Sequence, residues 1–379
     1  MFETIQFSSN LAQAFRKYLT SFHNVAPYVR RLVLQRFHTV QFPRMAWYAQ
    51  NLKFPYFPMV KTLEISGGYT EDLATFLFAF PQLSSLRLGR IAWTKGVEGP
   101  ELHPVIPSSD EFIQELALDG MDDSVLRWLT SGAVRFRLRI LSITLSPSVN
   151  DDSVRQLLQA AGRLLEEMRV TFQHDSSRRA NCDMGLWGLI FNTGIRKFTA
   201  NMEVRAGDDA RDYVAWVPHA LASLRSLQLR EIRLEMRVHP QVASSVQMSG
   251  SSIRTVMRCV DKVDWTHVDK TIEKIGRTVK KVAVVVSLEV FDDVLHYSSA
   301  DETWRTQLGA AIAARLGSTL RRTNIVLGVT VDFVKERGKR TPRRDSPKPI
   351  IKPRWFALGL PVEESAVKER FKRMLERSC

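Results

Sequence analysis

The sequence has few cysteines and no long apolar run. Cys182, Cys259 and Cys379 lie far apart, so the paired spacing of a disulfide framework or a zinc site is missing. The longest apolar run, residues 282–290, contains a glutamate and is too short to cross a bilayer. Residues 1–10 show no basic region followed by an apolar run, so we expect no secretory signal. We therefore expect a reduced, cytoplasmic environment and no membrane partner.

The signatures of common catalytic and phosphate-binding sites are also missing. The sequence contains no G-x-x-x-x-G-K-[ST], G-x-G-x-x-G, H-E-x-x-H or G-x-S-x-G motif. His174 and Cys182 each lie beside an aspartate and are interpreted as ordinary loop residues, and the pair Asp208–Asp209 has a turn-like context. We therefore expect no catalytic residue, no cofactor and no metal site, and we do not expect an enzyme.

The positive charge is concentrated near the C-terminus. Of the net charge of +14, residues 335–355 supply +7, from nine Lys/Arg against Glu336 and Asp345. Because the remaining charge is not clustered, we do not expect nucleic acid as a partner. Residues 335–355 predict a basic, Pro-rich disordered linker, which also fits a nuclear import signal, and the sequence leaves both interpretations open. Residues 356–379 predict a short amphipathic helix.

What the sequence does contain is a recurring apolar pattern. The stretches FPMVKTLEI (residues 57–65) and FPQLSSLRLGRIAW (residues 80–93) both contain Φ-x-x-Φ-x-Φ, where Φ is apolar. Further copies begin at Val29, Ile113, Leu138, Leu165, Leu224, Val279 and Val326, with a weak copy at Ile195 and Phe198. With 44% apolar residues, three fixed positions match by chance at roughly thirty places in such a chain.

The spacing of the copies and the segments between them carry more information. Successive copies up to Leu224 are 23 to 31 residues apart. Several gaps hold a capped helix: one after residues 150–152 that Gly162 ends, one after Asp122 and Asp123 that Gly132 ends, and one that Thr266 caps.

Strand, loop, helix and loop in each unit are typical of leucine-rich repeats. We predict an α/β fold, an irregular, horseshoe-like leucine-rich-repeat solenoid over residues 1–334, with strands on the concave face and helices on the convex face. An ordinary α/β domain with similar strands is the alternative. The Asn or Cys that regular repeats place three residues after the last Φ is absent, and residues 94–109 and 239–252 predict long loops that interrupt the period.

A solenoid of this kind offers the strand face for binding. Successive residues of a strand point to opposite faces of the sheet. The residues directly before, between and after the second and third Φ therefore point away from the core. A protein partner fits this mixed-charge set, with arginine as an anchor. The predicted protein-binding residues are Arg31, Glu64, Arg87, Asp119, Glu167, Arg169, Gln228 and Arg230.

Three stretches carry a resemblance to a known family. Residues 10–34 (NLAQAFRKYLTSFHNVAPYVRRLVL) look like the segment that follows the F-box in F-box proteins of mushroom-forming fungi. Residues 80–93 and VDWTHVDKTI (residues 263–272) look like repeats of the same family. The resemblance covers roughly residues 1–334.

The resemblance implies the substrate-recognition part of a cullin-type ubiquitin ligase, in which the repeats hold an unidentified target. An F-box should precede residues 10–34, and this chain begins too late to contain one. The Skp-type linker and the cullin are therefore expected partners only if an F-box is supplied. LPVEESAVKERFKRML (residues 360–375) has a similar opening, but it stands at the wrong end. A ligase-independent repeat scaffold, or a truncated gene product without its F-box, is the alternative.

Overall fold

The structure is a computed structural model. It describes residues 4–7, 28–35, 59–69, 77, 80–92, 112–121, 123–133, 136–145, 151–172, 189–205, 216–239, 252–291 and 300–334. The chain forms two compact units. Unit 1 comprises Met1–Arg178 and Cys182–Ile195, and unit 2 comprises Arg179–Asn181 and Arg196–Cys379.

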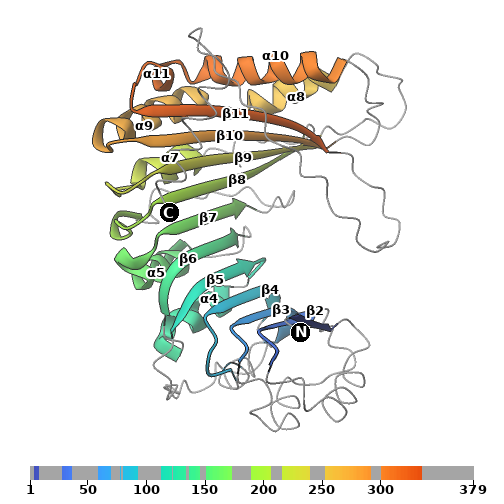
Figure 1. Cartoon of the computed structure of the whole chain (residues 1–379), viewed down its shortest axis with the longest axis vertical. Helices are drawn as coiled ribbons and strands as arrows, with labels where there is room; N and C mark the ends of the chain where they lie inside the picture. The colour runs from blue at the N-terminus through green and yellow to red at the C-terminus, as the bar shows by residue number, and fades with distance from the viewer. Residues whose placement is uncertain are drawn as a thin grey trace. The chain divides into compact units, whose positions relative to one another are not determined.

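Unit 1 contains a sheet in which neighbouring strands are parallel and follow the order of the chain (Figure 1). Parallel neighbours require a crossover connection, and the segments between the strands supply it. The strands are β1 (Thr4–Phe7), β2 (Arg31–Gln35), β3 (Thr62–Tyr69), β4 (Ser85–Ala92), β5 (Ile113–Asp119), β6 (Phe136–Leu145) and β7 (Glu167–Phe172).

The register of these strands confirms the predicted repeat in unit 1. The second Φ of each copy forms one row across the sheet: Leu32, Leu63, Leu86, Leu116, Leu141 and Met168. The third Φ forms the next row on the same face: Leu34, Ile65, Leu88, Leu118, Ile143 and Val170. Every one of these side chains is at most 3% exposed, so the pattern marks the core.

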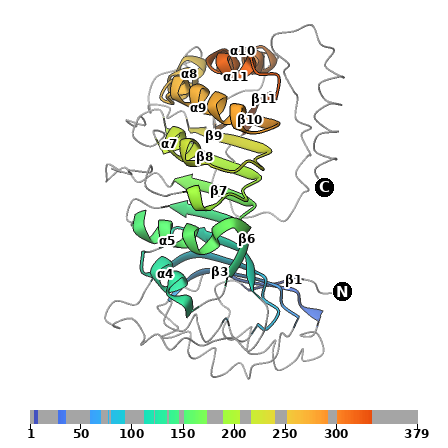
Figure 2. The same cartoon turned by 90° about the vertical axis from the view of Figure 1, so that its left-hand side faces the viewer.

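Helices follow some of the strands of unit 1 and bury an apolar side. They are α4 (Asp123–Trp128), α5 (Asp151–Ala161) and the short π and 3₁₀ turns η2 (Leu129–Ala133), η3 (Gly162–Leu164) and η5 (Leu189–Phe191). In α5 the predicted apolar stripe of Val154, Leu157, Leu158 and Ala161 is buried. Both α4 and α5 lie on one side of the sheet (Figure 2).

The helix ends test two predictions. Gly162 ends α5 as predicted, with a φ of +56° that favours glycine. Gly132 does not close α4, because the chain widens into the π-helical turn η2 that continues to Ala133. Thr130 Oγ1 donates to the carbonyls of Leu126 (3.1 Å) and Arg127 (3.1 Å), so carbonyls of the preceding turn are bonded by a side chain.

Unit 2 repeats the arrangement with longer strands and more helices. Its strands are parallel and neighbour one another in chain order: β8 (Lys197–Arg205), β9 (Glu231–His239), β10 (Val282–Phe291) and β11 (Ile325–Val334). Its helices are α7 (Trp216–Ser223), α8 (Ser252–Val260), α9 (Trp265–Thr278), α10 (Ala300–Arg315) and α11 (Gly317–Leu320). One strand per repeat, in parallel and in chain order, fits the predicted α/β leucine-rich-repeat class.

Two predicted copies in unit 2 are out of register. In the copy at Leu224, Leu227 is 72% exposed and lies before the strand, while Leu229, Ile232 and Leu234 are buried. The backbone N–H of Gln228 donates to Ser226 Oγ (3.2 Å), so these residues form a turn and the strand begins only at Glu231.

The copy at Val326 fails for a different reason. Strand β11 already begins at Ile325, so Val326 and Val329 lie on opposite faces of one strand. Val326 packs against Ala283 and Val285, away from the core side that holds Val329.

The predicted cap of α9 is also corrected. The N-cap is Asp264, whose carboxylate accepts from the N–H of His267 (3.0 Å), while Thr266 lies within the first turn. Trp265 Nε1 donates to the carbonyl of Val260 (2.8 Å) and joins the start of α9 to the end of α8.

Several predictions fall outside the described residues. These are the loop at residues 94–109, the interior of the loop at 240–251, the linker at 335–355 and the helix at 356–379. The horseshoe shape and the boundary at residue 334 stay predictions. None of the helices in the described ranges is both long enough and apolar enough to span a membrane.

Candidate protein-binding surface

The side of the unit 1 sheet opposite the core carries three rows of side chains in register. We call this surface the unit 1 strand face. Its first row is Arg31, Thr62, Ser85, Glu115, Ile140 and Glu167. The second row is Val33, Glu64, Arg87, Ala117, Ser142 and Arg169, and the third is Ser66, Gly89, Asp119, Thr144 and Thr171. These positions alternate with the buried Φ residues, so they project away from the core.

Six of the eight predicted binding residues lie together on the unit 1 strand face. They are Arg31, Glu64, Arg87, Asp119, Glu167 and Arg169. Arg31 donates to Glu64 across two strands at 2.9 Å, with both side chains partly exposed. An exposed pair of this kind stabilises the fold by only about 0–1 kcal/mol.

Three further charged residues of this face are exposed. Arg87, Asp119 and Glu167 are exposed and form no ion pair among the described residues. Arg87 and Glu64 are direct neighbours in the second row, and Asp119 lies one row further along the next strand. Positive and negative groups therefore alternate over a short distance, and such a pattern discriminates between partners by charge complementarity.

The other two predicted residues do not lie on a strand. Gln228 and Arg230 precede β9, because the predicted register in this part of the chain was wrong. The N–H of Arg230 donates to the carbonyl of Arg196 (2.8 Å), which places Arg230 at the start of β8 and β9 in unit 2. Its side chain is exposed there.

The equivalent face of unit 2 was missed by the sequence analysis. Strand β9 reads EIRLEMRVH, in which Ile232, Leu234, Met236 and Val238 are buried and the alternating charged residues point the other way. This strict alternation of charged and apolar residues in the sequence predicts a strand with one buried and one charged face. The charged residues of β9 are Glu231, Arg233, Glu235, Arg237 and His239.

Ion pairs already connect most of these unit 2 charges. Arg233 lies 2.9 Å from Glu231 and 3.8 Å from Glu235. Arg237 donates to Glu289 of β10 at 3.1 Å. At the end of the strand, His239 is 3.6 Å from Glu203 and its ring stacks on Phe291, with 4.7 Å between ring centroids.

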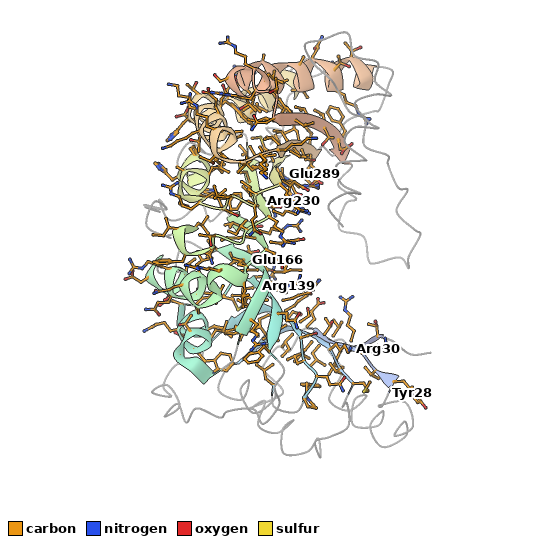
Figure 3. The ribbon with its side chains drawn as sticks, turned by 60° about the vertical axis from the view of Figure 1, so that its left-hand side comes forward. Tyr28, Arg30, Arg139, Glu166, Arg230 and Glu289 are labelled. Atoms are coloured by element: carbon orange, nitrogen blue, oxygen red, sulfur yellow. The ribbon has the colours of Figure 1, made fainter. Side chains whose placement is uncertain are left out.

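One strong pair in unit 1 was also missed. Arg139 donates to both carboxylate oxygens of Glu166, with Nη2 at 3.0 Å from Oε1 and 3.2 Å from Oε2, and the two side chains lie side by side in Figure 3. Each residue directly precedes a first-row position, Ile140 and Glu167. The sequence prediction covered only positions within the strand face and not the residues that directly precede the first row. A bidentate arginine–carboxylate pair has a defined geometry, and this pair lies beside the first row of the strand face.

The helix side of unit 2 contains a carboxylate with a perturbed pKa. Hydrogen bonds from Arg322 (2.6 Å) and Arg277 (3.1 Å) lower the pKa of Glu273 below its ordinary value, against a smaller opposing effect of burial. Glu273 lies on α9, so this cluster joins α9 to the turn before β11. Across the described ranges, no group of three or more His, Cys, Asp or Glu side chains is arranged to hold a metal ion.

Comparisons with known proteins add one weak likeness. No protein family model matches the chain, and neither does any curated protein sequence. Among solved structures, the chain is similar to the leucine-rich repeat-containing protein LegL7 from Legionella pneumophila. The two are 13% identical, with 89% of this chain and 91% of that chain covered and a TM-score of 0.44. At this TM-score the likeness carries no argument about fold or function.

Proposed function

We propose that the chain is a protein-interaction module that binds an unidentified target protein on the unit 1 strand face. The observation that carries the proposal is the set of six charged side chains that strand pairing holds in three rows. The backbones of these six residues belong to one hydrogen-bonded sheet, so their spacing is fixed before a target binds. Binding therefore costs little backbone entropy on this side of the interface.

The chemistry of the face indicates the kind of target. Arginine is enriched among the residues that dominate binding energy at protein interfaces, and three of the six residues are arginines: Arg31, Arg87 and Arg169. Glu64, Asp119 and Glu167 stand among them, so a surface of one sign alone would meet like charges. The face favours a folded protein surface of mixed charge over a polyanion.

The experiment compares two charge-swapped variants that keep the net charge. In the test variant, Arg87→Glu is combined with Asp119→Lys on the strand face. In the control, Asp152→Arg is combined with Arg155→Asp on α5, where the native side chains form an exposed pair (2.6 Å) that the swap restores with the charges exchanged. Wild type and both variants are immobilised at equal density, and the proteins they retain are quantified by mass spectrometry.

We expect a set of proteins that wild type and the α5 control retain equally and that the strand-face variant loses by about tenfold or more, as expected when interface charges meet like charges. Circular dichroism and thermal unfolding must match among the three proteins. Retention of the same set by the strand-face variant would exclude this face as the binding surface.

A finer proposal concerns the ligase. The resemblance of residues 10–34, 80–93 and 263–272 to F-box proteins of mushroom-forming fungi supports a role as the substrate-recognition part of a ubiquitin-ligase adaptor, with the target on the strand face. A ligase-independent scaffold is the alternative. Size-exclusion chromatography with light scattering, on the chain mixed with a Skp-type linker from such a fungus, separates them. A one-to-one complex supports the adaptor, and no complex at about 10 μM supports the scaffold for the chain as given.

A further inference from the structure

The large apolar side chains that are exposed in the described part of unit 1 all lie in turns that precede a strand. Tyr28 is 60% exposed before β2 (Figure 3), and Met59 is 36% exposed before β3. Leu164 is 56% exposed before β7, while Ile190 and Phe191 of η5 are 49% and 43% exposed before β8. Because the strands are parallel, the turns before them lie along one edge of the sheet, which we call the unit 1 turn edge.

The fold does not need these exposed side chains for its core. Each of the four turns already buries a residue directly next to an exposed one: Val29, Val60, Leu165 and Leu189, all at most 1% exposed. An apolar side chain that stays in water adds little to folding, because the hydrophobic gain requires burial. Several exposed apolar side chains grouped on one edge instead mark an interaction site.

The first of two clusters joins the turns before β2 and β3. The N–H of Lys61 donates to the carbonyl of Arg30 (2.8 Å), and the N–H of Thr62 donates to the same carbonyl (3.0 Å). Tyr28 and Met59 therefore stand in neighbouring turns, accompanied by the exposed side chains of Arg30 and Lys61.

The second cluster joins η3 to η5. Asn192, which directly follows η5, donates to the carbonyl of Gly162 (2.9 Å), the first residue of η3. A Cβ on Gly194 would lie 2.0 Å from the carbonyl oxygen of Arg163, so the two turns are in backbone contact. The exposed apolar side chains of η3 and η5 are therefore neighbours, and the exposed Arg163 lies beside them.

Positive charge accompanies the apolar side chains in both clusters. Arg30, Lys61 and Arg163 are exposed, and none of them has an ion pair or a side-chain hydrogen bond among the described residues. The turns that carry the clusters, residues 28–30, 59–61, 163–165 and 189–191, hold no aspartate or glutamate. Aromatic residues, methionine and arginine are enriched at protein–protein interfaces, and all three types are present here. The composition therefore favours a protein partner with acidic groups.

We infer that the unit 1 turn edge binds an acidic segment of a protein partner that also carries apolar side chains. The carboxylates of this segment pair with Arg30, Lys61 and Arg163, and its apolar residues contact the exposed side chains of the two clusters. The starts of β3 and β7 are four strand spacings apart, roughly 19 Å at about 4.8 Å each, which an extended segment of about six residues covers. One segment can therefore reach both clusters.

The test measures binding of a fluorescein-labelled peptide of glutamate, leucine and phenylalanine residues to the full chain, by fluorescence anisotropy. The test variant is Arg30→Glu with Lys61→Glu on the edge. The matched control is Lys270→Glu with Lys274→Glu, which changes the net charge equally at exposed positions on α9 of unit 2. The basic segment 335–355 is present in every variant, so any binding there is the same in all of them.

We expect the edge variant to weaken peptide binding by about tenfold and the α9 control by about twofold or less, because paired charges interact locally at physiological salt. Leu164→Ser is expected to weaken binding by about fivefold and to leave a peptide with serine in place of its apolar residues unaffected. Leu227→Ser, at a 72% exposed leucine of unit 2, is its matched control and should change neither. Circular dichroism and thermal unfolding must match wild type for every variant.

The strand-face variant, Arg87→Glu with Asp119→Lys, should bind the peptide as wild type does, so the unit 1 turn edge and the unit 1 strand face are tested separately. A tenfold loss in that variant would overturn the inference by placing the peptide on the strand face. Equal losses in the edge and α9 variants, or no loss in either, would place the binding away from the edge. Tighter binding of an oligothymidine or of phosphatidylserine vesicles than of the peptide, with the same loss in the edge variant, would reassign the edge to another class of anion.

Discussion

Two asparagines tie a helix end to the following repeat, one in each unit. Asn192 is fully buried, and its Nδ2 donates to the carbonyls of Leu158 and Gly162, both at 2.9 Å, at the end of α5. Asn324 Nδ2 donates to the carbonyls of Gly276 (2.6 Å) and Val279 (3.0 Å) at the end of α9. The last carbonyls of a helix have no intrahelical donor, and each asparagine side chain supplies hydrogen bonds to such carbonyls.

These contacts make the asparagines sensitive positions. Asn324→Ala removes two hydrogen bonds and leaves two carbonyls of the α9 end without a donor, so we expect a loss of about 2 kcal/mol in the free energy of unfolding. Asn192→Ala should cost at least as much, because the site is fully buried. Urea unfolding followed by circular dichroism measures both. Thr323→Ala, at the exposed neighbouring position, is the control, and an equal loss there would contradict the assignment.

Regular leucine-rich repeats carry an asparagine or cysteine three residues after the last Φ, and the copies in this chain have neither there. The structural asparagines stand before a strand, in the connection from the preceding helix. Nothing in the local sequence distinguishes them, because their partners are carbonyls that lie 30 to 48 residues away. A contact of this separation follows from the tertiary packing of one repeat on the next, so the spacing of the repeat did not predict it.

At the scale of elements, Glu273 joins two parts of unit 2. It stands on α9, receives Arg277 from the next turn of the same helix and Arg322 from the turn before β11. Asp269, one turn earlier on α9, accepts from the N–H groups of Ser318 and Thr319 at 2.8 Å each and fixes the start of α11. Two carboxylates on one helix therefore position the connection that leads into the last described strand.

The pH dependence of stability tests the Glu273 cluster. Its pKa is lowered in the folded state, chiefly by Arg322 and then by Arg277, so folding favours the charged carboxylate. The resulting stabilisation is present above the unfolded-state pKa and is lost as the pH falls through the folded-state pKa. Glu273→Gln should therefore lower the urea midpoint at pH 7 and converge with wild type only as the pH falls through the lowered pKa of Glu273 in the folded state. A difference that does not change with pH would contradict an electrostatic role, and Glu167→Gln, an exposed carboxylate on β7, provides the comparison.

The success of the sequence analysis differs between the units for a physical reason. In unit 1 the copies from Val29 to Leu165 align row by row, because each second and third Φ is buried on the same face of the sheet. Strands β10 and β11 run for ten residues and are apolar on both faces in part, as Ala283, Val285 and Val326 show. Such strands match Φ-x-x-Φ-x-Φ at several offsets. The pattern therefore identified β11 without its register, whereas in β10 the predicted Val282 and Val284 do lie in the core.

At the scale of the whole chain, charge and core are distributed unequally along the sequence. The described strands end at Val334, and the most basic segment, with half of the net charge, follows directly at residues 335–355. Few apolar residues in that segment can join a core, which is why it is predicted to be disordered. The unit 1 strand face consists of residues before this boundary, so binding there should not need the segments that follow it.

Truncation tests this boundary. A chain that ends at residue 340 is expected to keep the far-UV circular dichroism per folded residue and to unfold within about 2 °C of the full chain, because it retains all of β11. A chain that ends at residue 322 removes β11, which pairs with β10 over ten residues and buries Val329 and Val331, and should lose its cooperative transition in unit 2. If ending at residue 340 already lowers the midpoint by about 5 °C or more, residues beyond it pack against the repeats and the predicted domain boundary at residue 334 is wrong.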